Sequence, residues 1–166
     1  MDTLKYTIEP LSYDTLHQTI LLRDTVFSNL SEDEKQLLEA SLDPKKFHTS
    51  LENNSIESMQ YWIIFDSFAQ KTIGMVGLYY EVDFSHIAWL GWFAVDKKFR
   101  KNKLGKKLLE FAIEKAKENS ANELHLYSWD SKEYAPAIEL YKKYQFTFYT
   151  PKHKTYKRDI FMKKVL

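Results

Sequence analysis

Hydrophobic residues recur at helical spacing in the first third of this chain. Apolar positions follow that spacing over residues 14–28. A second helix is predicted from Ser31 to Leu42, because Ser31-Glu-Asp-Glu has the pattern of a capping box and Pro44 ends the segment. Before and after these helices, residues 4–9 are predicted to form a short edge strand, and the polar stretch 45–60 shows no periodicity and is left unassigned.

From residue 61 onward, continuous apolar runs replace helical spacing. Three runs joined by short turns predict an antiparallel meander, followed by a helix, a strand, a helix and two strands. The predicted strands are residues 61–65, 72–80, 87–95, 123–127, 145–150 and 156–165, and the predicted helices are residues 103–118 and a segment that begins near Pro136.

This order of elements predicts an α/β (α+β) fold. The expected architecture is a mixed, mostly antiparallel central sheet of about six to seven strands with helices on both faces. The strand, helix and strand of residues 87–127 should form a parallel crossover. Because the chain has 166 residues and no repeat, linker or low-complexity tract, we expect a single domain over residues 1–166.

The composition excludes several classes of protein. The chain has no cysteine, which excludes disulfides, thiolate catalysis and cysteine-based metal sites. No segment approaches the roughly 20 apolar residues of a membrane span, and the N-terminus lacks the apolar stretch of a signal peptide. We therefore expect a cytoplasmic protein without a membrane partner.

The basic charge of this chain is local. The 24 Lys and Arg residues against 23 Asp and Glu residues give a net charge of +1, so no nucleic-acid partner is expected. The five histidines have no metal-ligand spacing, so no metal is expected either. Seven cationic residues nevertheless gather within eleven positions: Lys97, Lys98, Arg100, Lys101, Lys103, Lys106 and Lys107.

The basic turn lies between an apolar strand and an amphipathic helix. The first N–H groups of a helix have no internal partner, and the helix dipole adds partial positive charge at that end. A helix start with Arg100 before it and Gly105 in its first turn therefore suits an anion such as a pyrophosphate. A cofactor that carries a pyrophosphate is the first hypothesis, and an ordinary solvated basic turn is the alternative.

Three stretches resemble the GNAT superfamily of N-acetyltransferases. Residues 95–109 are similar to the family's Val-x-Pro-x-Tyr-Arg-Gly-x-Gly-x-Gly-x-x-Leu-Leu, residues 137–146 are similar to Ala-x-x-Leu-Tyr-x-x-x-Gly-Phe, and residues 158–164 resemble its last strand. The resemblance covers about residues 60–165 and implies the GNAT fold with its splayed pair of parallel strands. The chain departs from the family pattern at Lys103 and Gln145, which replace glycines, and at Tyr134, where many members have Asn.

The resemblance implies acetyl transfer from acetyl-CoA to a primary amine of a small molecule, an amino acid or a peptide N-terminus. Acetyl-CoA would be a co-substrate, held by main-chain groups of the strand that ends at Val95 and by the turn from Arg100 to Lys106. The implied cofactor-binding residues are Phe93, Ala94, Val95, Arg100, Lys101, Lys103, Leu104, Gly105, Lys106 and Tyr134.

Two residues are candidates for catalysis. Tyr141 matches the tyrosine that commonly protonates the leaving thiolate in this family, and packing on the apolar face of its helix is the alternative. Trp89 stands where some members carry a glutamate base, so Glu81 on the adjoining turn is the candidate base. Asp83, His86, Tyr127 and Asp130 stay open for that role, and for each candidate an ordinary solvated residue is the alternative. His125 is expected to be a strand residue with a satisfied hydrogen bond.

The acceptor amine is expected on the opposite side of the splayed strands, beneath the N-terminal helices. The aromatic residues there suit an apolar pocket around an amine, and core packing of most of the rings is the alternative: Phe27, Tyr79, Tyr80, Phe84, Trp89 and Trp92. A rival interpretation is a non-catalytic acyl-CoA-binding or regulatory domain of the same fold, motivated by Trp89 and Tyr134. The sequence leaves a homodimer open.

Overall fold

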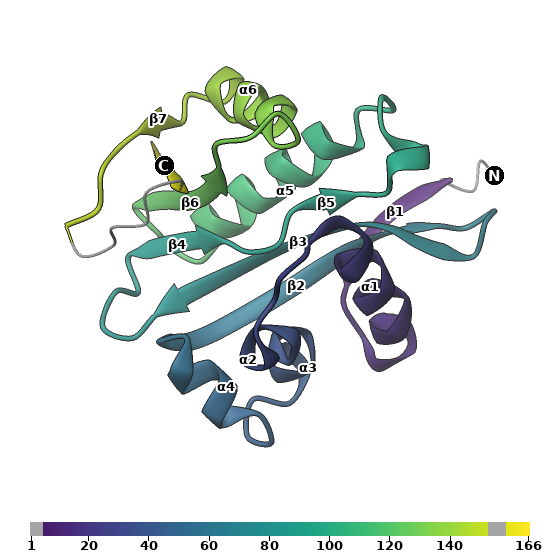
Figure 1. Ribbon diagram of the computed structural model, residues 1–166, viewed down its shortest axis with the longest axis horizontal. Coiled ribbons are helices and arrows are strands. Elements are labelled where there is room, and N and C mark those ends of the chain that lie inside the picture. Colours follow the sequence, from purple (N-terminus) through teal and green to yellow (C-terminus); the bar gives the residue numbers. More distant parts are fainter. Residues whose placement is uncertain (1–4, 153–158) are drawn as a thin grey trace.

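The computed structural model describes residues 5–152 and 159–166, in which eight strands form one sheet (Figure 1). Among the strand pairs of these described residues, only β4 and β6 run parallel. Along the sheet the order is β1 (Tyr6–Pro10), β2 (Ile56–Asp66), β3 (Lys71–Glu81), β4 (Ile87–Leu90), β6 (Glu123–Trp129), β8 (Asp159–Val165) and β7 (Thr147–Phe148), and β5 (Ala94–Val95) pairs with β3.

The predicted mixed sheet is confirmed, with one strand more than expected. The strand predicted over residues 87–95 is divided into β4 and β5, because the chain leaves the regular ladder between them. The unassigned stretch 45–60 contains a short helix and the first residues of β2, which begins at Ile56. Residues 156–158 of the last predicted strand lie outside the described residues.

Helices cover both faces of the sheet, as predicted (Figure 1). One face carries α1 (Tyr13–Val26), α2 (Glu32–Lys35), α3 (Leu37–Leu42) and α4 (His48–Asn53), and the other carries α5 (Leu104–Glu118) and α6 (Ala135–Lys143). We call them the α1 face and the α5 face.

The helix predicted from Ser31 to Leu42 is interrupted. Its capping box is present, since Ser31 Oγ accepts from the Glu34 N–H at 3.1 Å and Glu34 Oε2 accepts from the Ser31 N–H at 2.7 Å. Gln36 ends α2 with φ −85° and ψ −5°, and its side-chain oxygen accepts a hydrogen bond from Ser50 at the start of α4. A tertiary contact that the sequence pattern does not reveal therefore accompanies the break.

The core follows the alternation of the strands. Successive side chains of a strand point to opposite faces, so one strand serves both layers. On β3, Val76 and Leu78 pack with α5, whereas Met75 packs on the α1 face. This alternation decides which side chains of β4, β6 and β8 can meet a substrate on the α1 face.

Candidate functional site

The chain between β4 and β5 contains a β-bulge. The Gly91 N–H donates to the Gly77 carbonyl at 2.7 Å, yet Ala94 pairs with Met75. From Gly91 to Ala94 the chain advances by three positions, whereas from Gly77 to Met75 the partner strand β3 advances by two. One extra residue is therefore inserted on the β4–β5 side. The predicted strand 87–95 is broken at this insertion.

Gly91 is required at the bulge because Tyr61 lies directly against it. A Cβ on Gly91 would lie 2.7 Å from Tyr61 Oη and 3.2 Å from the Gly77 Cα, closer than side chains pack. The Trp92 N–H donates to the same Tyr61 hydroxyl at 3.5 Å. The Tyr61 side chain thus supports the bulge from beneath, and it is buried.

After the bulge, alternate backbone groups face away from β3. The Asp96 N–H donates to the Ile73 carbonyl at 2.8 Å, and Ala94 pairs with Met75. Because the two edges of an antiparallel strand alternate, the backbone groups of Phe93 and Val95 face the other edge.

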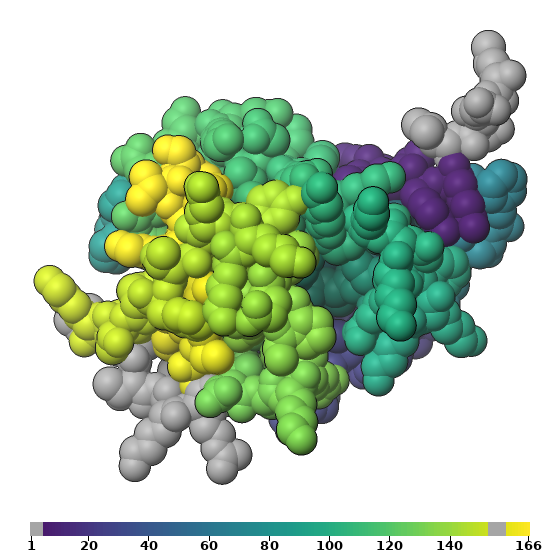
Figure 2. All heavy atoms as spheres, turned by 90° about the horizontal axis from the view of Figure 1, so that it is seen from above, coloured from purple at the N-terminus to yellow at the C-terminus, as the bar shows by residue number. Residues whose placement is uncertain are grey.

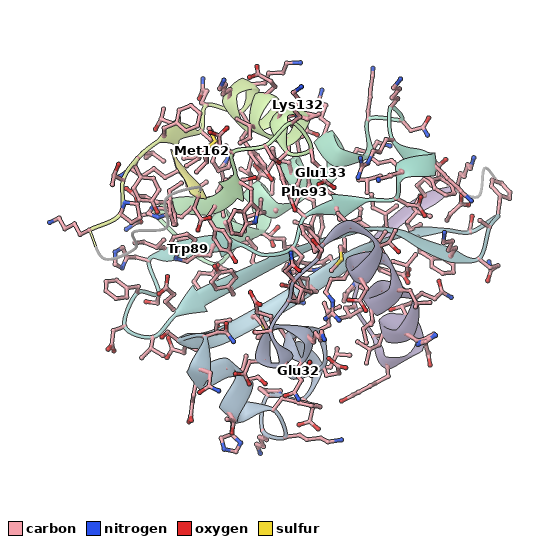
Figure 3. The ribbon with its side chains drawn as sticks, viewed as in Figure 1. Glu32, Trp89, Phe93, Lys132, Glu133 and Met162 are labelled. Atoms are coloured by element: carbon pink, nitrogen blue, oxygen red, sulfur yellow. The ribbon has the colours of Figure 1, made fainter. Side chains whose placement is uncertain are left out.

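No strand pairs with that other edge within the described residues. The parallel ladder of β4 and β6 ends at the pair of Trp89 with His125, after which β6 continues to Trp129 beside β8. We call the space between Phe93–Val95 and Leu126–Trp129 the wedge. Figure 3 shows Trp89 and Phe93 on the two sides of the bulge. The predicted splayed pair is confirmed.

A basic turn joins β5 to α5 beside the wedge. Asp96 anchors it, because its carboxylate accepts from the Lys98 N–H at 2.9 Å and from Lys71 Nζ at 2.8 Å. Burial acts to raise the pKa of Asp96, but these two donors hold it below the usual range. Arg100 Nε donates to the Val95 carbonyl at 3.1 Å, which fixes the predicted anion-binding arginine at the edge of the wedge.

The start of α5 presents unpaired backbone donors. Lys103 is the N-cap and its side chain makes no cap hydrogen bond, and the first helical hydrogen bond of this turn runs from the Lys107 N–H to the Lys103 carbonyl. Within residues 5–152 and 159–166, the N–H groups of Leu104, Gly105 and Lys106 have no acceptor. Unpaired N–H groups at a helix N-terminus favour an anion.

Two of the family's glycine positions keep a left-handed backbone without glycine. Lys103 has φ 60° and Gln145 has φ 67°. A side chain in this region strains the backbone by roughly 1–2 kcal/mol. The loops therefore hold the shape that glycine would give, and at Lys103 the chain gains a cation. Lys101, with φ 70°, has the same backbone conformation.

Gly105 is a position that would accept a side chain. A Cβ there would lie 3.7 Å from Phe93 Cζ and 3.9 Å from Leu140 Cδ2, which is ordinary contact. Leu104 beside it is buried and anchors the helix start in the core. The residues predicted to bind the cofactor between Phe93 and Lys106 thus surround one helix start, although their roles stay predictions.

Tyr141 lies close to the wedge. Its ring centroid is 5.9 Å from that of Phe93 and 5.7 Å from that of Phe146, and the residue is 6% exposed. Its hydroxyl makes no hydrogen bond to any described residue, and burial raises its pKa well above the ordinary value. The ring therefore packs, as the alternative interpretation expected, while the hydroxyl is left free for a ligand.

Tyr134 caps the same helix. It precedes α6 as its N-cap, and burial raises the pKa of its phenol. Tyr141 lies seven positions further along the chain, which places both tyrosines on one side of the helix. Figure 2, viewed from above, shows a hollow between the yellow-green C-terminal part and the green turn before α5, with darker teal atoms as its floor.

Glu81 lies apart from these groups. It ends β3 on the α1 face, four positions beyond Gly77 opposite the bulge, a distance of about 13 Å along a strand. Tyr141 packs on the α5 face. The structure therefore does not bring the two predicted catalytic residues together on one face, and the role of Glu81 stays a prediction.

The predicted aromatic pocket needs one correction. Tyr80 lies on the α5 face, where Asn119 Nδ2 donates to its hydroxyl at 3.1 Å, so its assignment to the acceptor side was wrong. Neighbouring residues of a strand point to opposite faces, and Tyr79 takes the place on the α1 face. There Tyr79 stacks on Trp89 with ring centroids 6.1 Å apart.

Side chains of the α1 face pack against Trp92 in the bulge. The buried Arg23 guanidinium lies 5.0 Å from the Trp92 ring centroid and donates to the Lys35 carbonyl at 2.7 Å. Phe27 packs against the same tryptophan at 6.3 Å. One side chain of α1 therefore joins the bulge to α2, a role that the sequence did not reveal.

His125 belongs to a polar network with Tyr149 and Glu123. Its Nδ1 lies 2.8 Å from Tyr149 Oη and its Nε2 lies 2.5 Å from Glu123 Oε2. The expectation of a satisfied strand histidine is confirmed. Glu-x-His in a strand puts both side chains on one face, and that spacing was the available signal. Lys163 Nζ lies 3.5 Å from Glu123 Oε1.

The other surface features of the described residues give little evidence for a further ligand site. A small pocket is lined by Trp62, Tyr80 and Asn119 among others, at the far end of α5, about 22 Å along the helix from its start. The described part of the chain contains no cluster of three metal-ligating side chains. None of its helices has the length and apolarity needed to cross a bilayer.

A comparison with family models decides what this arrangement is. The model of the acetyltransferase (GNAT) family matches residues 25–146, most of the chain. The chain belongs to the GNAT family. It is accordingly a GNAT acetyltransferase, one of the N-acetyltransferases that depend on acetyl-CoA, as the sequence motifs predicted. No curated protein matches the chain.

Solved structures show the same fold at low identity. A GNAT acetyltransferase from Staphylococcus aureus Mu50 has a TM-score of 0.71 at 21% identity, over 96% of this chain and 98% of that one. The NatC complex bound to Gag peptide and CoA gives 0.73 at 17%, over 98% and 99%. The PaiA N-acetyltransferase of Thermoplasma acidophilum, in complex with coenzyme A, gives 0.66 at 18%, over 98% and 100%.

Proposed function

We propose that this GNAT acetyltransferase binds acetyl-CoA between the wedge and the start of α5, and transfers the acetyl group to a primary amine that approaches from the α1 face. One observation carries the proposal. The outward edge of Phe93 and Val95 adjoins the unpaired N–H groups of Leu104 to Lys106, so main-chain donors for a thioester arm and for a pyrophosphate are contiguous.

The charges of the turn support the same placement. Arg100 is fixed by Val95, and within the described residues Lys101 and Lys103 form no ion pair, so both ammonium groups are available to phosphates. Lys106 lies 3.8 Å from Glu110, a weak contact that a phosphate would replace. Helix donors and cations together suit a diphosphate better than either alone.

The backbone edge would also stabilise the reaction. Attack of a neutral amine on a thioester forms a carbon–nitrogen bond and places negative charge on the carbonyl oxygen. A main-chain N–H held in fixed geometry stabilises that charge without reorganising. We assign this role to the outward N–H groups of Phe93 and Val95.

Tyr141 would assist the departure of the thiolate by a hydrogen bond. An ordinary phenol has a pKa of about 10 and an ordinary thiol about 8.5, so full proton transfer to the sulfur is unfavourable by about 2 kcal/mol. Burial raises the pKa of Tyr141 and widens that gap. The tyrosine therefore donates a hydrogen bond to the leaving sulfur, and the thiolate takes its proton from solvent.

The acceptor is a primary amine of a small molecule, an amino acid or a peptide N-terminus. The structurally similar NatC complex is bound to a peptide, which supports including peptides among the candidates. Exposed Tyr127 and Trp129 on β6 offer an apolar surface beside the wedge. We expect no nucleic acid and no metal in the reaction.

Calorimetry and a thiol-release assay test this function. We expect acetyl-CoA to bind and at least one amine of a panel to release CoA, the panel being tripeptides with varied N-terminal residues, free amino acids and spermidine. Binding of acetyl-CoA without turnover on any amine would favour the non-catalytic domain. Absence of binding would refute both.

A further inference from the structure

We propose that Tyr149, His125 and Glu123 form a proton relay that removes the proton from the acceptor nitrogen. This inference rests on the proposed function and assigns the general base that the sequence left open. Tyr149 is the group that meets the amine, and His125 and Glu123 act through it.

The hydrogen bonds of the network have a definite direction. Burial lowers the pKa of His125, so its imidazole is neutral at pH 7 and has one donor and one acceptor nitrogen. The hydrogen bond from His125 lowers the pKa of Glu123, which is therefore a carboxylate that only accepts. It follows that Nε2–H donates to Glu123 and that Nδ1 accepts from the Tyr149 hydroxyl.

The relay lies at the point where the strands separate. His125 forms the last pair of the parallel ladder, opposite Trp89, so the wedge begins one residue further along β6. Leu124 and Leu126 pack with α5, which puts the His125 side chain on the α1 face. There the imidazole lies edge-on to Trp89, with centroids 5.2 Å apart.

Both ends of the relay have access to solvent, whereas its central histidine is buried. His125 is buried, whereas Tyr149 is only partly buried, and the Glu123 side chain is 28% exposed. Tyr127 on the same face of β6 is 46% exposed, so the described residues leave this part of the sheet accessible. An amine can therefore reach Tyr149, and a proton can leave through Glu123.

The proton balance of the step is simple. After a neutral amine attacks the thioester, its nitrogen is positively charged and acidic. The Tyr149 oxygen takes that proton while the Tyr149 hydroxyl proton moves to His125 Nδ1, so no tyrosinate forms. Glu123 stabilises the resulting imidazolium. The carbon–sulfur bond then breaks, the thiolate leaves, and the imidazolium returns its proton to solvent.

The first test removes the hydroxyl that meets the amine. Tyr149→Phe should lower kcat at least about 100-fold, the usual contribution of a general base, with the Kd for acetyl-CoA unchanged. Tyr144→Phe is the matched control, because Tyr144 donates to Glu110 on the outer side of α5 and α6. We expect that control to retain full kcat. Full kcat in Tyr149→Phe would overturn the relay.

The second test moves the pKa of His125 in both directions. The charged and titratable groups that face its ring are Glu123, Lys163, Tyr149 and Glu81. Glu123 raises the pKa of His125 and Lys163 lowers it. The acid limb of the pH profile is the fall in kcat/KM at low pH, where His125 becomes protonated. Glu123→Gln should therefore shift this acid limb to lower pH, and Lys163→Met should shift it to higher pH. A purely structural network would change the rate without moving the limb.

Nuclear magnetic resonance tests whether the protonation of His125 causes the acid limb of the pH profile. The His125 ring signal, identified by its loss in His125→Gln, should titrate at the pH of the acid limb in the native chain and in both variants. A limb that does not follow this titration overturns the relay but leaves acetyl transfer intact. Failure of every panel amine, with acetyl-CoA bound, would refute acetyl transfer and the relay together.

Discussion

Replacing Gly105 by glutamate should raise the stability of the fold while weakening the binding of coenzyme A. Gly105 occupies the first turn of α5, and a Cβ there meets only Phe93 and Leu140 at 3.7 and 3.9 Å. The substitution therefore fits without displacing its surroundings. Any loss of affinity must come from the carboxylate.

The substitution is expected to stabilise the fold and to weaken CoA binding, and the two effects can be estimated separately. Removing glycine from a helix gains about 0.5–1 kcal/mol, and an acidic side chain near a helix N-terminus adds about 0.3–1 kcal/mol. For a chain of this size the gain corresponds to a rise in Tm of roughly 2–8 °C. A carboxylate about 5 Å from one phosphate charge is unfavourable by about 1–3 kcal/mol, so the Kd should rise roughly 5- to 150-fold.

Gly105→Ala is the control, because it adds the same Cβ without the charge. Thermal unfolding should show both variants at or above the native Tm, and calorimetry with CoA should show the native Kd for Gly105→Ala alone. The loss in Gly105→Glu should diminish at high salt. Native affinity in Gly105→Glu would refute a pyrophosphate at the start of α5.

Other substitutions test the remaining parts of the account. Tyr141→Phe should lower kcat about 10- to 100-fold without changing the Kd for acetyl-CoA, because it removes one hydrogen bond to a charged sulfur, and stopped-flow thiol release measures this. Because burial raises the pKa of Tyr61, Tyr79 and Tyr141, folding should lose free energy as the pH rises above 10, where these phenols ionise more readily in the unfolded chain; urea titrations at pH 8 and 11 check the sign. Lys103→Gly should stabilise the fold by about 1 kcal/mol, because it relieves the strain of the left-handed backbone at this position. The same variant should bind CoA more weakly, because it removes one ammonium group near the phosphates, and native affinity would exclude Lys103 from the site. Gly91→Ala should destabilise the fold by about 1–3 kcal/mol, because its Cβ would meet the Tyr61 hydroxyl at 2.7 Å, and unchanged stability would contradict the packing described for the bulge.

Much of the fold was predictable because its signals are local. The meander, the crossover of residues 87–127 and the capping box at Ser31 each follow from spacing within a short window. The basic turn was likewise recognisable, and the structure places it at the start of α5 beside β5.

The bulge and the proton relay were not predictable in the same way. The division of the strand 87–95 depends on the Tyr61 hydroxyl beneath Gly91, a contact between residues 30 positions apart. The relay joins His125 to Tyr149, which meet only because β7 and β8 extend the sheet beyond β6. Such contacts depend on register, and a sequence pattern records alternation but not register.

Tyr79 and Tyr80 show that a shift of one strand position moves a side chain to the opposite face of the sheet. They are consecutive aromatic residues, and from their place near the turn after β3 both were expected on the acceptor side. The pairing of Tyr79 with Trp89 fixes the alternation, so Tyr79 lies toward α1 and Tyr80 toward α5. One strand position decides between an acceptor wall and the opposite core.

The most direct measurement of the central claim is a titration of the ¹⁵N-labelled protein with CoA, followed by amide chemical shifts. We expect the largest changes at the backbone N–H groups of Phe93, Val95, Leu104, Gly105 and Lys106, since these are the donors assigned to the thioester arm and the pyrophosphate. Changes confined to the far end of α5 around Asn119, or none at saturating CoA, would contradict the placement.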